Sequence, residues 1–136
     1  MNAMAHIDWM HLCELAYFDR QSRLCIVGMT THFVLPSLPI RLRQIMIVAR
    51  VADARPGERL DVGFGLATPA GVWISPNSSD DVHVEVTGEH VLVTLRDVPF
   101  QEEGAHRFGI QLGAHQLATV DVPVVIMPAS QPAEFH

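Results

Sequence analysis

The feature that most constrains the fold is strict alternation of apolar and polar residues between positions 82 and 95. Valines at 82, 84 and 86 alternate with polar side chains, and apolar residues return at 91, 93 and 95. Between the runs stands Gly88-Glu89, and a Gly-X pair suits a type II′ turn because glycine accepts a positive φ there. This turn sets Val86 opposite Val91, Val84 opposite Val93, and Val82 opposite Leu95. The stretch therefore predicts an antiparallel hairpin with all its apolar residues on one face.

Similar alternation recurs along the rest of the chain. It predicts an opening hairpin from 8–18 and 24–34, and further strands over 45–51, 60–66, 107–112 and 120–126. Because Pro123 has no N–H, we expect its strand to be an edge, or to turn that position outward. About eight short strands with no strong helix predict an all-β fold, a single antiparallel β-sandwich that is immunoglobulin-like in the broad sense. A barrel is the alternative.

Length and composition favour one domain. The chain has 136 residues, 49% of them hydrophobic, which is enough for a core without disulfides or metals. No linker divides it, so we expect one domain over 1–136, with a core at about 7–127 and a flexible tail at 128–136.

Charge argues against nucleic acid as a partner. The formal net charge is −6, and the nine positive residues are arginines scattered along the chain. Nucleic-acid binders normally carry a basic face. The N-terminus lacks the pattern of a signal peptide, and no apolar run approaches the ~20 residues of a membrane helix. We therefore expect a cytoplasmic protein with no membrane or nucleic-acid partner.

The two cysteines lie in the predicted opening hairpin. A turn centred on Gln21 places residue i opposite residue 42 − i, so Cys25 faces Tyr17 and Cys13 faces Met29. The thiols are then roughly 13 Å apart along the strands. A disulfide needs Cα atoms within about 7 Å. Both cysteines are predicted to be buried thiols that pack as small hydrophobic side chains.

Metal and catalytic motifs are absent from the sequence. The weak metal-ligand candidates are His11 and Cys13 on one strand, and His83 and Glu85 on another. A zinc site needs three or four converging ligands, and no CxxC, HExxH or HxH spacing occurs. No nucleophile elbow or phosphate-binding loop is present. The sequence therefore predicts a protein that is not an enzyme and has no cofactor.

Several positions resemble an uncharacterised family of short bacterial β-sandwich proteins, a domain of unknown function. The matching residues are Cys13, Glu14, Ile26, Gly28, Leu38, Pro39, Gly57, Glu58, Gly104, His106, Phe108 and Ile110. The similarity spans roughly residues 7 to 127 and implies a β-sandwich. It carries over no catalytic residue, because none is established. Ser22-Arg23 replaces the usual Gly-Lys of the first turn, and His106 replaces a commoner tyrosine.

These observations favour a non-enzymatic module that binds another protein or a second copy of itself as a homo-oligomer. Trp73 is a candidate anchor, and the apolar residues Val120, Val122 and Val124 are candidates on an expected edge strand. One alternative is a metal-binding protein or metal-dependent enzyme that uses the His, Cys and Glu residues named above. Another is a small-ligand or carbohydrate-binding sandwich with its site at Trp73 and the 75–81 loop.

Overall fold

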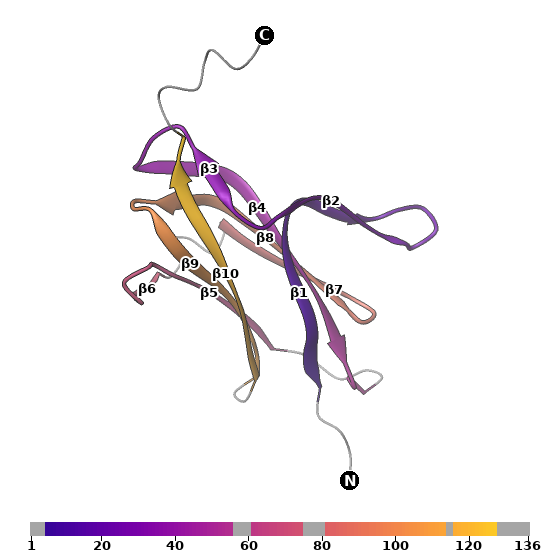
Figure 1. The fold of residues 1–136 in the computed structure, drawn as a ribbon. Helices are drawn as coiled ribbons and strands as arrows, with labels where there is room; N and C mark the ends of the chain where they lie inside the picture. The colour runs from indigo at the N-terminus through magenta and orange to yellow at the C-terminus, as the bar shows by residue number, and fades with distance from the viewer. Residues whose placement is uncertain (1–4, 56–60, 75–80, 114–115, 128–136) are drawn as a thin grey trace.

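A computed structural model describes residues 5–55, 61–74, 81–113 and 116–127 (Figure 1). The described chain forms two five-stranded sheets. Sheet A has the order β2 (Leu24–Thr30), β1 (His6–Phe18), β4 (Ile40–Ala52), β8 (His90–Phe100) and β7 (Val82–Thr87). Sheet B has the order β3 (Phe33–Leu35), β10 (Gln116–Ile126), β9 (Gly104–Leu112), β5 (Val62–Ala67) and β6 (Trp73–Ile74). Within the described residues, no helix is long and apolar enough to cross a membrane.

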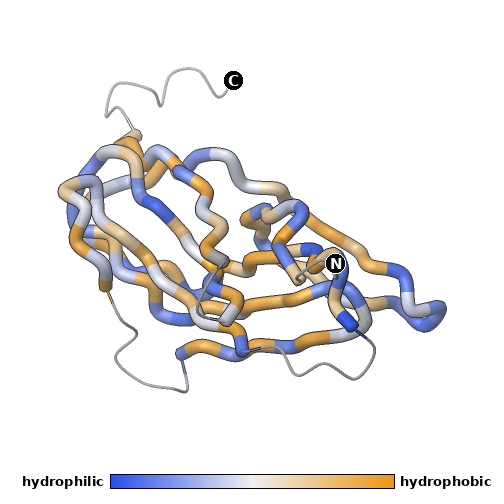
Figure 2. Tube along the Cα trace, turned by 90° about the horizontal axis from the view of Figure 1, so that it is seen from below, coloured by the Kyte–Doolittle hydropathy of each residue, from blue (hydrophilic) through white to orange (hydrophobic). Residues whose placement is uncertain are grey.

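One hydrophobic core draws on both sheets. Sheet A contributes Ile47 and Val93, and sheet B contributes Phe108 and Val122, all of them without solvent exposure. Along β4, β9 and β10, alternate residues therefore face this shared core, as the period of two in the sequence requires. Figure 2 shows the same alternation of hydrophobic and hydrophilic positions along the strands.

The predicted hairpins are confirmed. Val86 pairs with Val91, Val84 with Val93 and Val82 with Leu95, so the expected register of β7 and β8 is correct. The opening hairpin follows the expected rule as well, since Cys13 lies opposite Met29 and Cys25 opposite Tyr17. Strands β9 and β10 also pair antiparallel, with Phe108 opposite Val120.

Three expectations need correction. The described residues contain ten strands, not about eight. The predicted strand 24–34 ends at Thr30, and the chain then moves to sheet B, where Phe33–Leu35 pairs parallel to β10. Strand β10 is therefore not an edge, because β3 and β9 lie on its two sides. A sequence period reports which face of a strand is buried, but it does not report which strand lies beside it.

The sheet edges differ in length. Sheet B ends in β3 and β6, of three and two residues, and such short strands offer little backbone to another chain. Sheet A ends in β2 and β7, of seven and six residues. Strand β7 carries His83 and Glu85, whereas β2 has the sequence LCIVGMT, without charge or proline. Strand β2 is thus the less protected edge.

Candidate interaction surface on the β1–β2 arm

The hairpin of β1 and β2 extends beyond the sheet that it begins in. Pairing of β1 with β4 ends at Cys13 opposite Met46, whereas pairing with β2 continues to Phe18 opposite Leu24. Residues 14–30 therefore form a two-stranded arm, here called the β1–β2 arm, which projects at the right of Figure 1. Figure 2 shows its hydrophilic tip.

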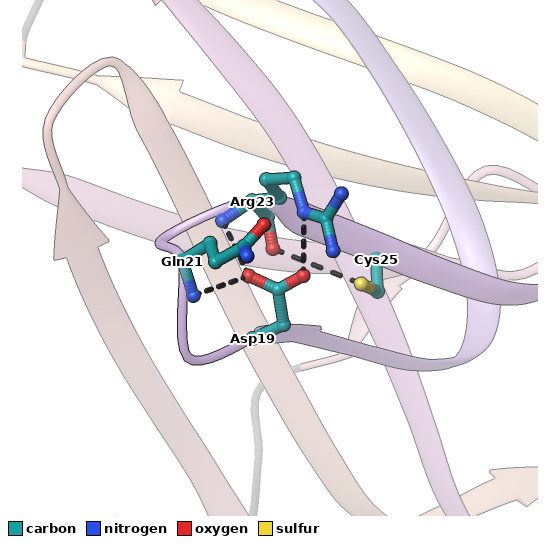
Figure 3. A network of polar contacts seen from close by, with 4 residues as sticks. All are labelled: Asp19, Gln21, Arg23 and Cys25. Atoms are coloured by element: carbon teal, nitrogen blue, oxygen red, sulfur yellow. Dashed lines mark hydrogen bonds and ion pairs between the residues drawn. The ribbon is translucent and has the colours of Figure 1, made fainter.

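Asp19 fixes the turn of the arm (Figure 3). Its carboxylate accepts hydrogen bonds from the backbone N–H groups of Gln21 and Arg23, at 2.8 and 2.9 Å. The Nε of Arg23 donates to the other carboxylate oxygen at 2.7 Å. The hydrogen bond from the Arg23 backbone, followed by those from the Arg23 side chain and the Gln21 backbone, lowers the pKa of Asp19 below its usual range. Asp19 and Arg23 are thus paired with each other within the turn.

A sharp twist separates the arm from the rest of sheet A. Leu12 and Ala16 lie on the same face of β1, yet Leu12 packs in the main core and Ala16 in a second apolar cluster. Between them Glu14 lies against Gly28, which has a φ of +67°. A Cβ at Gly28 would lie 2.8 Å from Cγ and Cδ of Glu14. Glycine therefore supplies both the left-handed backbone and the space for Glu14.

One face of the arm packs onto the outer face of sheet A. This second cluster comprises the buried residues Cys13, Ala16, Met46, Val48 and Leu92, with Trp9, Phe18, Leu24 and Ile26 packed around them. The Ala16 N–H donates to Sδ of Met46 at 3.3 Å. Phe18 approaches His90 of β8, with ring centroids 6.0 Å apart. The arm therefore lies across β4 and β8 and is held there by apolar contacts.

The opposite face of the arm is apolar but exposed. This arm face consists of Leu15, Tyr17, Cys25, Val27 and Met29. Leu15 pairs with Val27 and Tyr17 with Cys25, so the side chains form one cross-strand group. The four largest are between 42% and 55% exposed, and Cys25 is half-buried. Such a contiguous apolar group on a surface is typical of an interaction site.

The outer edge of β2 also has free hydrogen-bonding groups. Asp19 N donates to the Arg23 carbonyl at 2.9 Å, which marks that pair as hydrogen-bonded. Because such pairs alternate in an antiparallel ladder, Cys25, Val27 and Met29 point their backbone groups toward β1. Leu24 and Ile26 then point theirs away, and no described residue bonds to these groups. The next outward carbonyl, of Gly28, accepts from Thr30 Oγ1 at 3.1 Å.

The two cysteines have different environments. Both are free thiols, and Cys13 is buried beneath the arm as the sequence predicts. Burial raises the pKa of the Cys13 thiol. Cys25 is only half-buried and lies on the arm face, so the expectation that both thiols are buried is wrong for Cys25.

The weak metal candidates are not brought together. His11 and Cys13 lie on β1, whereas His83 and Glu85 lie on β7 at the far edge of sheet A. Strands β4 and β8 intervene, which separates the two pairs by roughly 14 Å at about 4.8 Å per strand. His11 stacks on Trp9 with ring centroids 5.4 Å apart. Among the residues that the structure describes, no three His, Cys, Asp or Glu side chains are grouped for a metal.

The partner-binding candidates on β10 are misplaced. Val122 and Val124 have no solvent exposure, and Val120 packs against the core. Because β10 is an inner strand, its apolar residues serve the core, and Val122 and Val124 are not accessible to a partner. The sequence did not identify the arm face, although one signal was present. Both halves of the opening hairpin carry apolar residues on both faces, which an ordinary one-sided surface hairpin does not need.

Trp73 lies on the outer face of sheet B and is 49% exposed. Its ring rests over Gly65, where an added Cβ would lie 2.8 Å from Cε3, and its Cη2 reaches Gly109. Leu117 also lies close to Gly109, with its Cδ1 3.3 Å from the position of an added Cβ. A groove of about 380 Å³ runs beside the indole and is also lined by Gln111. Of the loop predicted with Trp73, residues 75–80 lie outside the described residues, as does the predicted tail 128–136.

His106 is buried, with 2% of its surface exposed. Its Nδ1 lies 3.1 Å from the carbonyl oxygen of Gly104, and its ring meets Phe100 edge-on with centroids 5.0 Å apart. The histidine that replaces a tyrosine of the family pattern is therefore a core residue with a hydrogen-bond partner.

Solved structures similar to this chain include the M1 domain from titin, at 6% identity and a TM-score of 0.34 over 62% of this chain and 78% of that one. A second is a mutant form of the titin M10–obscurin-like 1 Ig complex, at 15% identity and a TM-score of 0.34 over 68% of this chain and 98% of that one. No curated protein matches the sequence. A family model for a family of unknown function, DUF6941, matches residues 8–125. The chain therefore belongs to the DUF6941 family.

Proposed function

We propose that this protein is a non-enzymatic protein-interaction module whose contact surface is the β1–β2 arm. The observation that carries the proposal is the arm's second apolar face. One face is already used, because it packs on Met46, Val48 and Leu92 of sheet A. The other presents Leu15, Tyr17, Val27 and Met29 to solvent beside the uncharged edge strand β2.

Backbone and side chains both support binding at this surface. An open strand edge accepts an added strand through main-chain hydrogen bonds, while neighbouring side chains supply specificity. The outward N–H and C=O groups of Leu24 and Ile26 provide the main-chain hydrogen bonds, and the arm face provides the side chains. The arm is also held rigidly by its packing on sheet A, which lowers the conformational entropy lost on binding.

Site-specific photo-crosslinking in cells that produce the protein tests this proposal. A photoreactive phenylalanine analogue replaces Val27 on β2, or Val86 on β7 as the matched control. Both valines lie on edge strands of sheet A, and they are 46% and 45% exposed. We expect a covalent protein adduct at position 27 and none at position 86. Equal labelling at both positions, or no adduct at 27, contradicts the proposal.

The groove beside Trp73 supports a second candidate function, the binding of a small ligand such as a sugar ring. An exposed indole face stacks on sugar C–H groups, and the amide of Gln111 lies in the same groove. Titration with a panel of mono- and disaccharides, followed by tryptophan fluorescence, tests this function. The candidate requires a saturable change that the W73F variant loses, and a flat response to the whole panel contradicts it.

A further inference from the structure

The partner of the β1–β2 arm is the remaining question, and this inference rests on the function proposed above. We infer that the arm binds a second copy of this chain by antiparallel pairing of β2 with β2, around a two-fold axis at Cys25. Sheet A of one copy then continues into sheet A of the other. The two arm faces become one apolar surface shared by both copies.

The free backbone groups determine this register. Leu24 and Ile26 are the outward residues whose N–H and C=O groups have no partner within the described chain. A two-fold axis at Cys25 places Leu24 of each copy opposite Ile26 of the other. Each such pair exchanges two hydrogen bonds in an antiparallel ladder, so all the free groups of these residues are satisfied. A register displaced toward the C-terminus would engage Gly28, whose φ of +67° breaks the extended backbone.

Charge favours a second copy over a charged peptide. The chain has a net charge of −6, so two copies repel each other unless they meet on an uncharged surface. Strand β2 has no charged residue, and neither does the arm face. The nearest cation, Arg23, is already paired with Asp19 at 2.7 Å in its own turn. An acidic or basic peptide would find no opposite charge on the strand itself.

In the proposed register, crosslinking between two Cys25 thiols reports directly on the dimer. Residues at the two-fold axis form a non-hydrogen-bonded pair with Cα atoms about 4.5 Å apart, so the two Cys25 thiols face each other. A short bis-maleimide should join two wild-type chains and should fail to join two C25S chains. Cys13 is buried beneath the arm in each copy and does not substitute for Cys25.

The same register predicts how a lysine acts at position 27. Val27 of one copy lies opposite Arg23 of the other, so V27K places like charges across the interface twice. We expect V27K to weaken association by about tenfold or more, since one lost interaction of ~1.4 kcal/mol already gives that factor. V86K adds the same charge at an equally exposed valine of β7 and should leave association unchanged.

The decisive experiment is amide hydrogen exchange by NMR over a dilution series, with the mass measured by sedimentation equilibrium on the same samples. We expect the mass to approach twice 15.0 kDa at high concentration. The Leu24 and Ile26 amides should become protected with it, while Cys25 and Val27 stay protected throughout. A monomer at every concentration overturns the inference, as does a dimer that V86K dissociates and V27K does not. If the chain stays monomeric but residue 27 crosslinks to a different protein, the proposed function stands and the second copy is excluded. If Leu24 and Ile26 are protected in samples whose mass is that of a monomer, both proposals are excluded.

Discussion

The side chain of Glu14 lies against the position that a Cβ of Gly28 would occupy, with Cγ and Cδ 2.8 Å from it. The two residues face each other across β1 and β2, between the Cys13–Met29 and Leu15–Val27 pairs. This contact is the point at which the hairpin turns from the main core to the outer face of sheet A. Both residues belong to the family pattern in the sequence, and the structure assigns that pattern to the twist of the arm.

Replacement of Gly28 by alanine tests the twist. A left-handed backbone costs an alanine about 1–2 kcal/mol, and the new Cβ must also displace Glu14. Gly88 has a φ of +60° with no atom within 4 Å of its Cβ position, so G88A has only the backbone cost. We expect G28A to lower the free energy of unfolding in urea more than G88A does. The excess should vanish when G28A is introduced into an E14A background and compared with that parent; an excess that persists would assign the cost to something other than Glu14.

The contact between Gly65 and Trp73 can be tested by a pair of substitutions in which loss of the indole removes the effect of G65A. Alanine at position 65 places its Cβ 2.8 Å from the indole, so G65A must displace the ring. We expect G65A to destabilise the wild type and to have little effect in a W73A background. Trp73→Ala alone should cost about 1–2 kcal/mol, below the ~3–5 kcal/mol of a fully buried tryptophan, because about half of the residue's surface is already exposed. Equal effects of G65A in both backgrounds would show that the ring does not rest on Gly65.

Thiol reactivity distinguishes the two cysteines. Cys13 is buried and its pKa is raised by burial, so its reactive thiolate is scarce and inaccessible. We expect a chromogenic disulfide reagent to label one thiol per native chain quickly and the second only in denaturant. The C25S variant should show no fast phase. A fast phase that survives in C25S would mean that the arm opens readily from sheet A.

The turn of the arm should weaken in acid. Hydrogen bonds from Arg23 and Gln21 lower the pKa of Asp19 in the folded state, so its contribution to stability is full above the ordinary value of about 3.9. That contribution is lost as the pH falls through the lowered pKa. We therefore expect D19N to be less stable than wild type at pH 7, with a difference that shrinks at about pH 2 to 3. Urea unfolding of both proteins at both pH values measures this difference in stability. A difference that does not change with pH would contradict the role of the Asp19 charge.

The sequence predicted the residue register within hairpins better than it predicted the position of each strand in its sheet. The register of β7 with β8 and of β1 with β2 followed from alternation and turn position, because side chains on a strand repeat every two residues. The neighbours of β10 did not follow, since a buried strand at an edge and one inside a sheet have the same period. The sequence did not predict that residues 14–30 form a separate arm, for a related reason. The rotation between Leu12 and Ala16 changes which layer a strand face meets, and no sequence period records it.

A photo-crosslinking scan along the β1–β2 arm tests whether the arm face is the surface that contacts other proteins. The photoreactive residue is placed in turn at Leu15, Tyr17, Val27 and Met29 on the arm face, at Phe18 on the packed face, and at Val86 on β7. We predict intermolecular adducts at the four arm-face positions, with only intramolecular products at Phe18 and none at Val86. Adducts absent from the arm face, or as strong at Val86 as at Val27, would contradict the assignment of the β1–β2 arm as the interaction surface.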